Sequence, residues 1–134
     1  MNVFVDTSAL LAVIDRSDER HAAAKRTWEE MLNGDHTLLC HNYVLVETSA
    51  VLTQRIGTEA VRVFERDVMP VLRLFWVTRE IHEAAVGVHL AAGRRALSLV
   101  DCTSFEVMRR TGVRTAFAFD PHFREFGCEL VGGA

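Results

Sequence analysis

Four carboxylates stand where the chain could hold a divalent metal ion: Asp6, Glu47, Asp101 and Asp120. Asp6 directly follows the apolar segment 3–5, and Asp120 directly follows the apolar segment 116–119. If both segments are strands of one parallel sheet, their carboxyl ends share the edge where open α/β sheets bind ligands. Carboxylates that converge repel one another unless a cation lies between them. Such an all-oxygen site favours Mg²⁺ or Mn²⁺ and suits hydrolysis of phosphodiester bonds.

Each of the three aspartates also has a simpler explanation as a helix cap. Asp6 and Asp101 precede segments with helical character, and aspartate is a favoured residue at that position. Asp120 precedes Pro121, and an acid before a proline is a common helix start. Capping does not explain why Asp6 and Asp120 both follow apolar strands.

Glu47 is not placed as a cap. It lies among apolar residues of a predicted helix, on a face with small side chains and room for a ligand. A lone carboxylate near a core is costly unless it is paired or bound to metal. The alternative is a glutamate at the margin of an amphipathic face, and both explanations stay open.

The elements that must position these acids alternate between strand and helix. We predict strands at 2–5, 37–41, 72–77, 114–119 and, as an edge, 128–131. We predict helices at 9–14, 18–32, 43–56 (capped by Asn42), 59–69, 79–92, 101–110 and, as a short turn, 121–126. Apolar strands separated by helices are typical of a parallel sheet covered on both faces. The fold class is therefore α/β, with a small parallel central sheet flanked by helices.

Length and composition indicate one globular domain. The 134 residues are 49% hydrophobic and 25% charged, so we expect a single domain over 1–131 and a flexible tail over 132–134. Three cysteines without a CxxC pair argue against a disulfide framework. The N-terminus is a poor signal peptide, and no apolar run approaches the roughly 20 residues of a membrane span. We therefore expect a cytoplasmic protein with no membrane partner.

The net charge of −3 does not exclude a nucleic-acid partner. Setting four of the 18 acids aside as metal ligands leaves 14 acids against 15 bases, close to neutrality. Lys25 is the single lysine, and arginine grips phosphate with a planar fork. A GC-rich genome explains the arginines equally well. Five of them are candidates for an RNA-binding rim or for a solvated helix face: Arg94, Arg95, Arg109, Arg110 and Arg114.

Other reactive side chains are not assigned to the site. The six histidines fit no zinc spacing, although His122 lies near Asp120 and is a candidate for substrate contact. Cys102 stands at a predicted helix start, where the pKa of a thiol falls, but no histidine is placed by sequence to act as its base. Burial is the expectation for Cys102.

Four segments together resemble a known family: VDTSAL (5–10), VE (46–47), LSLVDC (97–102) and FDPHF (119–123). They are similar to the PIN-domain nucleases, and most of all to the VapC-type toxins of bacterial toxin–antitoxin pairs. The resemblance runs from the first strand to about Gly127, essentially the whole chain. The opening segment and the two late ones are specific in combination, whereas Glu47 alone is a weak signal.

The resemblance implies a PIN fold and an endoribonuclease that depends on Mg²⁺ or Mn²⁺. It implies an RNA substrate, a homodimer and a cognate antitoxin whose C-terminal segment blocks the acidic cleft. It assigns four acids to the metal pocket: Asp6 and Asp101 as main ligands, with Glu47 and Asp120 completing it directly or through water. By the same resemblance, the hydroxyl of Thr7 or Ser8 orients Asp6.

Two other functions fit parts of the sequence. A receiver-type phosphoacceptor domain is also small, α/β and acidic at strand ends, but it needs a lysine near the last strands. Lys25 lies in an early helix, which counts against this function. A non-catalytic PIN scaffold that only binds a partner is the third possibility, and the presence of all four acids counts against it.

Overall fold

The computed structural model describes residues 1–132, and within them it contains a five-stranded sheet in the order β3-β2-β1-β4-β5. The strands are β1 (Asn2–Val5), β2 (Thr37–His41), β3 (Leu72–Phe75), β4 (Thr115–Phe117) and β5 (Glu129–Leu130). All four neighbouring pairs are parallel. The predicted α/β class with a small parallel sheet is confirmed.

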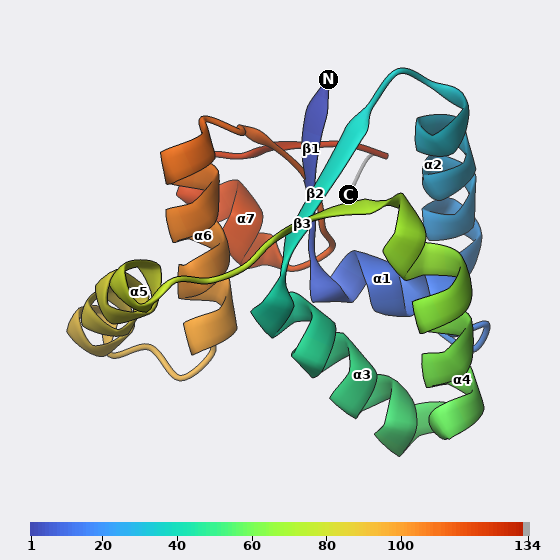
Figure 1. Ribbon diagram of the computed structural model, residues 1–134, viewed down its shortest axis with the longest axis horizontal. Helices are drawn as coiled ribbons and strands as arrows, with labels where there is room; N and C mark the ends of the chain where they lie inside the picture. Colours follow the sequence, from blue (N-terminus) through green and yellow to red (C-terminus); the bar gives the residue numbers. More distant parts are fainter. Residues whose placement is uncertain (133–134) are drawn as a thin grey trace.

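Helices cover the sheet on both sides. The α-helices are α1 (Thr7–Ile14), α2 (His21–Asn33), α3 (Asn42–Ile56), α4 (Thr58–Val63), α5 (Arg79–Ala92), α6 (Leu99–Thr111) and α7 (Pro121–Phe126). Figure 1 shows α6 and α7 on one side of the strands and α2 and α4 on the other. The helix α3 packs against both α1 and α6 below the sheet, so it joins the two groups.

The central strand β1 places the start of the site. Val3, Phe4 and Val5 are fully buried, as a strand covered on both faces requires. Val5 pairs with Phe117, so β1 and β4 reach the carboxyl edge of the sheet at the same level. The next residue, Asp6, therefore leaves the sheet at this edge, beside the segment that continues from β4.

The helix α3 is capped by a histidine, so the prediction that Asn42 caps it was wrong. The Nδ1 atom of His41 accepts the backbone N–H groups of Tyr43 and Val44, at 3.2 and 3.4 Å. The side chain of Asn42 instead accepts the N–H of Val77 at 2.7 Å, just beyond β3. Histidine is not a common cap, so propensity favoured the wrong residue.

The helix α6 begins before Asp101, which corrects the prediction that this residue starts the helix. Ser98 is the cap, and its Oγ accepts the N–H of Asp101 at 3.0 Å. Asp101 lies in the first turn, and its Oδ2 accepts the N–H of Ser98 at 3.0 Å in return. This reciprocal pair is a capping box, so the carboxylate is held rigidly from the backbone.

Other boundaries shift without changing the topology. The predicted helix 59–69 divides into α4, a π-helical turn (Phe64–Val68) and a 3₁₀ turn (Met69–Val71) that contains Pro70. The last three strands are shorter than predicted, and β4 ends at Phe117, two residues short of the predicted end. Apart from Gly132, the predicted tail at 132–134 lies outside the described residues.

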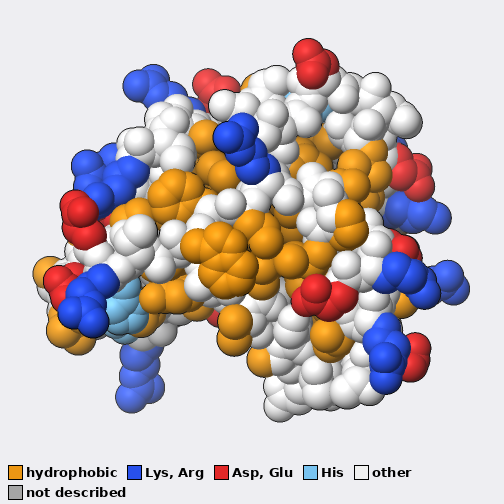
Figure 2. All heavy atoms as spheres, in the orientation of Figure 1, with side chains coloured by type: hydrophobic (Ala, Val, Ile, Leu, Met, Phe, Trp, Pro, Cys, Tyr) orange, Lys and Arg blue, Asp and Glu red, His pale blue; other side chains and the backbone are white. Residues whose placement is uncertain are grey.

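One face of the molecule is notably apolar. Figure 2 shows hydrophobic side chains gathered at the centre of the face seen in Figure 1, where β3 runs across the front. Trp76, directly after β3, is 67% exposed. Over residues 1–132, the helices are too short or too polar to cross a lipid bilayer.

Candidate metal centre

Asp6 is a buried carboxylate fixed at the carboxyl end of β1. Its backbone N–H donates to the carbonyl of Phe117 at 3.0 Å, which ties it to β4. Its side chain caps α1, since Oδ2 accepts the N–H and the hydroxyl of Ser8 at 3.2 and 2.7 Å. Only 2% of the residue is exposed. The cap explanation is therefore correct for Asp6, but it does not account for the charge around it.

Ser8 connects Asp6 to the segment that carries Asp120. Its Oγ donates to Asp6 and accepts the backbone N–H of Phe119 at 2.9 Å. Of the two hydroxyls predicted to orient Asp6, the structure gives this contact to Ser8. In residues 1–132 the buried Oγ1 of the other one, Thr7, has no hydrogen-bond partner.

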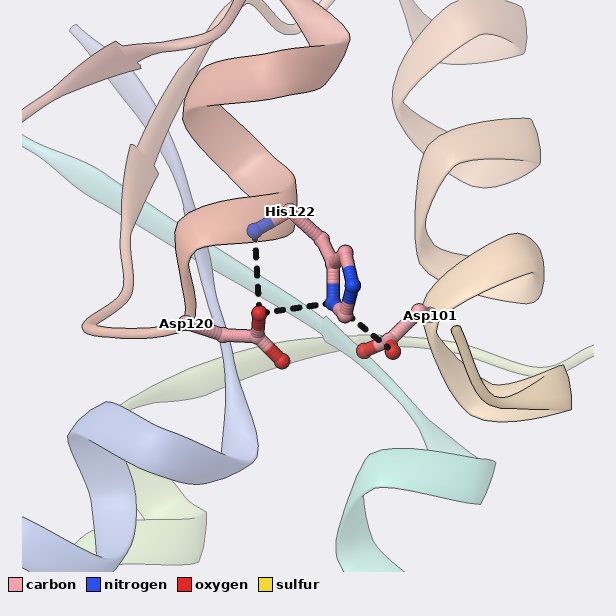
Figure 3. Close-up of side chains that lie close together, drawn as sticks. All are labelled: Asp101, Asp120 and His122. Carbon is pink, nitrogen blue, oxygen red and sulfur yellow. Dashed lines mark hydrogen bonds and ion pairs between the residues drawn. The ribbon is translucent and has the colours of Figure 1, made fainter. Parts of the chain in front are cut away.

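Asp120 and His122 meet Asp101 at the start of α7 (Figure 3). Asp120 caps this short helix by accepting the N–H of His122 at 2.9 Å. The Nδ1 atom of His122 lies 2.8 Å from Oδ1 of Asp120 and 3.6 Å from Oδ2 of Asp101. One ligand atom from each residue lies within 4.8 Å of the other two, a spacing that fits a single metal ion.

The electrostatics of the pocket disfavour free carboxylates. Burial, followed by the negative charges of Asp101 and Asp120, raises the pKa of Asp6 to about 7, although the Ser8 hydrogen bonds oppose this rise. Burial also raises the pKa of Asp101, together with the charge of Asp120, against the opposing effect of Ser98 and His122. The charges of Asp101 and Asp120 therefore act on Asp6, and within residues 1–132 no lysine or arginine forms an ion pair with these three aspartates.

Glu47 differs from the other three acids. It is half-buried in the second turn of α3. Within residues 1–132 the group of possible ligands formed by Asp101, Asp120 and His122 does not include Glu47 or Asp6, and no hydrogen bond or ion pair joins Glu47 to the aspartates. Its assignment to the pocket stays a prediction.

Two neutral side chains hold the helix that carries Asp101. Because Nδ1 of His41 accepts the cap hydrogen bonds, its proton is at Nε2, which donates to Ser104 Oγ at 2.9 Å. Ser104 in turn donates to the carbonyl of Val100 at 3.0 Å. Burial lowers the pKa of His41 to about 3, so the ring is neutral and this link between β2 and α6 is not disturbed near neutral pH.

Several arginines considered for RNA binding are engaged with acids. Arg109 and Arg110 both pair with the buried Glu106, and Arg94 pairs with Glu125. These contacts support structural roles in α6 and between α6, α5 and α7. Cys102 is buried as expected, and burial, followed by the charge of Asp101, raises the pKa of its thiol, so it is a poor nucleophile.

The residues present fit a divalent cation. Carboxylate oxygens and an imidazole nitrogen are ordinary ligands of such ions. The buried atoms Thr7 Oγ1 and His122 Nδ1 lack oriented partners in the described chain, and burial, with repulsion between the carboxylates, raises the pKa values of Asp6 and Asp101. A cation between the carboxylates would relieve both deficits. His122 is the member of this group that the sequence alone did not assign.

The fold and this pocket agree with a family assignment. The model of the PIN domain family matches residues 3–127, so the chain belongs to this family. PIN nucleases generally use a divalent metal, and the acidic cluster is consistent with that.

Relatives and a solved structure extend the comparison. The "23S rRNA-specific endonuclease VapC20" of two Mycobacterium tuberculosis strains (CDC 1551 / Oshkosh and ATCC 25618 / H37Rv) is 36% identical over 126 residues. This match covers 93% of the chain and 94% of the relative. The crystal structure of M. tuberculosis VapC20, described as a sarcin–ricin loop cleaving toxin, matches with a TM-score of 0.83 at 35% identity, over 94% and 95% of the two chains. The predicted family and the predicted endoribonuclease class are confirmed.

Proposed function

We propose that this protein is an endoribonuclease toxin whose divalent ion, Mg²⁺ or Mn²⁺, is held by Asp101 and Asp120 with Asp6 beside them. The observation that carries the proposal is the convergence of three carboxylates at the start of α1, α6 and α7, for which residues 1–132 supply no arginine or lysine ion pair. Several acids elsewhere in the fold pair with an arginine, whereas these three carboxylates do not within residues 1–132. This difference supports a cation-binding site. Glu47 and Thr7 are included as members of the pocket by their place in the family motifs.

The metal would lower the pKa of attacking water and neutralise charge on the phosphate. Hydrogen bonds within the chain fix the positions of the three carboxylates. The capping box holds Asp101, the Asp120 cap sets the start of α7, and Ser8 keeps Asp6 in register with the segment after β4. Asp120 has a side chain that is 27% exposed, so substrate can approach the pocket from its side.

Hydrolysis then proceeds at the phosphorus atom. The attacking water loses a proton to solvent as its oxygen forms a bond to phosphorus; the bond to the leaving ribose oxygen breaks, and that oxygen takes up a proton from solvent. With the ion bound, Asp6 would be ionised and would contribute negative charge beside the metal. The reaction therefore uses placement and charge, and it needs no covalent intermediate on the protein.

The competing functions lack support from the site. The phosphoacceptor function needs a lysine at the carboxyl edge of the sheet. Lys25 lies on α2 and lines a separate cavity with Trp28 and Val68. A scaffold without catalysis gives no reason to gather buried carboxylates at a cost in stability.

Cleavage of RNA by purified variants tests the proposal. We expect Asp101→Asn to lower the cleavage rate by more than ~100-fold, above the usual cost of losing an outer-sphere partner of a metal. Asp67→Asn is the matched control, because Asp67 is exposed and pairs only with Arg66. A folded Asp101→Asn variant that cleaves RNA at the wild-type rate, or activity that survives EDTA, would refute the proposal.

The substrate is proposed to be structured RNA. The named relative acts on 23S rRNA, and its structure is described as that of a sarcin–ricin loop cleaving toxin. We therefore propose ribosomal RNA as the substrate class and action in the cytoplasm, where that RNA lies. A synthetic sarcin–ricin hairpin, a transfer RNA and an unstructured messenger fragment, incubated side by side, would rank the substrates.

A protein antitoxin is proposed as the regulatory partner. A toxin that cleaves RNA requires control, and the pocket offers a negatively charged target for a basic segment of such a partner. Co-expression with the product of the adjacent short gene should yield a stable complex with suppressed RNA cleavage. Separate elution of the two proteins at high concentration would argue against that partner.

A homodimer is proposed on the apolar face. The strand β3 stands at the end of the sheet order, and Trp76 and Val71 beside it are 67% and 42% exposed. Exposed apolar patches of this kind mark interaction surfaces. Light scattering should give the mass of a dimer, and Trp76→Glu should yield a folded monomer. A wild-type monomer at high concentration would contradict this proposal.

A further inference from the structure

His122 is placed by backbone geometry directly against the carboxylates. It is the second residue of α7, and Asp120 holds its N–H at 2.9 Å. Figure 3 shows its ring between Asp120 and Asp101, with Nδ1 at 2.8 Å from one carboxylate and 3.6 Å from the other. The residue is 8% exposed, so the ring has little freedom to turn away.

The Nδ1 atom lacks a hydrogen bond of normal geometry. It is buried, and in the described part of the chain no acceptor or donor is aligned with it. The carboxylate of Asp120 is close, but its Oδ1 already accepts the backbone N–H of His122, and the ring contact is poorly aligned. Leaving a buried ring nitrogen without an aligned partner is costly, so a native structure is expected to supply one.

We propose that Nδ1 of His122 is a nitrogen ligand of the metal ion held by Asp101 and Asp120. The inference rests on the proposed function, in that it requires an ion in this pocket. A cation between the three residues would face the lone pair of Nδ1 and one oxygen of each carboxylate, which all lie within 4.8 Å of one another. The donor set is then mixed, which differs from the all-oxygen pocket expected from the sequence.

A mixed donor set has a consequence for metal choice. Mg²⁺ strongly prefers oxygen ligands and keeps much of its water, whereas imidazole suits first-row transition ions. Mn²⁺ accepts both kinds of ligand. His122 therefore tilts the pocket toward Mn²⁺, while the carboxylates alone would hold either ion.

The alternative role for His122 is positioning. A protonated Nδ1 would hold Asp120 and Asp101 in place and would make no bond to the metal. The two roles differ in a spectroscopic property, because only a coordinated imidazole couples its nitrogen nucleus to the unpaired electrons of Mn²⁺.

Pulsed EPR of the Mn²⁺-loaded protein is the test. We expect a nitrogen hyperfine coupling in the wild type that is absent from His122→Ala and His122→Asn, both checked for folding by circular dichroism. Mn²⁺ affinity, measured by EPR titration without RNA, should fall by at least ~10-fold in both variants, and Mg²⁺ affinity, measured by competition, should fall less. His89→Ala is the matched control, since His89 on α5 also has a buried, unpartnered Nδ1 in residues 1–132 but is outside the group of possible ligands, and it should keep the coupling.

The possible results distinguish the ligand role of His122 from the existence of the metal site itself. Tight Mn²⁺ binding that requires Asp101 but shows no nitrogen coupling would overturn the role of His122 and leave the proposed function standing. A coupling that persists in both His122 variants would overturn it as well. No specific Mn²⁺ binding by the folded wild type would overturn the metal site and the histidine ligand together.

Discussion

The two ends of α1 carry the same local motif with opposite electrostatic results. At its start, Ser8 donates its N–H and hydroxyl to Asp6, at 3.2 and 2.7 Å. At its end, Ser17 donates the same two groups to Asp15, at 3.0 and 2.6 Å. Both aspartates are almost fully covered, with 2% and 4% of the residue exposed. Their sequence contexts, Asp-Thr-Ser and Asp-Arg-Ser, are nearly alike.

The difference comes from residues far away in the chain. The Ser17 hydroxyl and the Arg55 guanidinium, 3.4 Å away, hold the pKa of Asp15 below its usual range despite the opposing effect of burial. Deep burial, followed by the charges of Asp101 and Asp120, raises the pKa of Asp6 to about 7. One end of the helix is a completed ion pair, and the other lacks a cation. The comparison shows that burial and tertiary neighbours, not the local motif, set the direction in which the pKa of each aspartate moves.

The largest contrast should appear in RNA cleavage. Asp6→Asn removes the charge but keeps an acceptor for Ser8, and we expect a loss of more than ~100-fold in cleavage rate because the metal pocket loses a carboxylate. Asp15→Asn should leave the cleavage rate unchanged within error. A gel-based assay of labelled RNA measures both. Equal losses in the two variants would break the comparison, because they would indicate a shared structural cause.

The pH dependence of stability should differ in sign between the two ends. The pKa of Asp6 is raised from 3.8 to about 7 by folding, so the folded state binds more protons between those values. In metal-free protein the free energy of unfolding should therefore fall as pH rises through this range, by roughly 2–4 kcal/mol from Asp6. Asp15 has the opposite effect. Because its pKa is lowered in the folded state, the stability that it contributes is lost as pH falls.

Urea unfolding in EDTA at about pH 5 and about pH 8 measures this dependence. For Asp6→Asn, the free energy of unfolding should decrease much less between the two pH values. This variant should also be more stable than the wild type at the higher pH. Asp15→Asn should keep the fall, which controls for the titration of other groups. A wild-type dependence in Asp6→Asn would mean that its carboxylate is not destabilised by burial.

Mn²⁺ should raise the free energy of unfolding through Asp6, at the start of α1, and not through Asp15 at its end. Mn²⁺ at about 100 times its dissociation constant should add about 2.7 kcal/mol to the free energy of unfolding, since the ion binds the folded state. Asp15→Asn should keep this gain, and Asp6→Asn should lose most of it. Thermal unfolding with and without Mn²⁺ gives the comparison. An equal gain in both variants would exclude Asp6 from the metal site.

The smallest contrast concerns the two serines. Ser8→Ala leaves the N–H of Phe119 without its acceptor, which should cost roughly 1–3 kcal/mol of stability. It should also reduce RNA cleavage by ~10-fold, the lower range for groups that support metal ligands. Ser17→Ala should cost about 1 kcal/mol and leave cleavage unchanged. Cleavage that is equal in the two serine variants would remove Ser8 from the pocket.

The topology and the location of the site could be predicted from the sequence. Apolar strands separated by helices specify a parallel sheet, and acids placed directly after strands must then share an edge. Asp6 follows from this rule directly, and Asp120 follows from it although β4 ends at Phe117, three residues earlier. Asp101 was selected as well, although its position inside the first turn depends on Ser98, a capping partner three residues earlier.

The sequence could not assign His122 or settle the role of Glu47, because their side-chain directions depend on the tertiary structure. His122 lies against Asp101 because the Asp120 cap turns the start of α7 toward α6. Likewise, His41 caps α3 because Asn42 is used by Val77, which lies beyond a different strand. Glu47 stays open for the same reason, since the direction of a half-buried glutamate on α3 depends on what fills the pocket.

Anomalous diffraction from Mn²⁺-soaked crystals tests the central claim most directly. We expect a peak at the manganese edge bounded by Asp101, Asp120 and His122 and adjacent to Asp6, and we expect no such peak in Asp101→Asn crystals soaked in the same way. A peak at another place, or no peak in crystals that diffract well in the presence of Mn²⁺, would contradict a metal centre at the carboxyl end of this sheet.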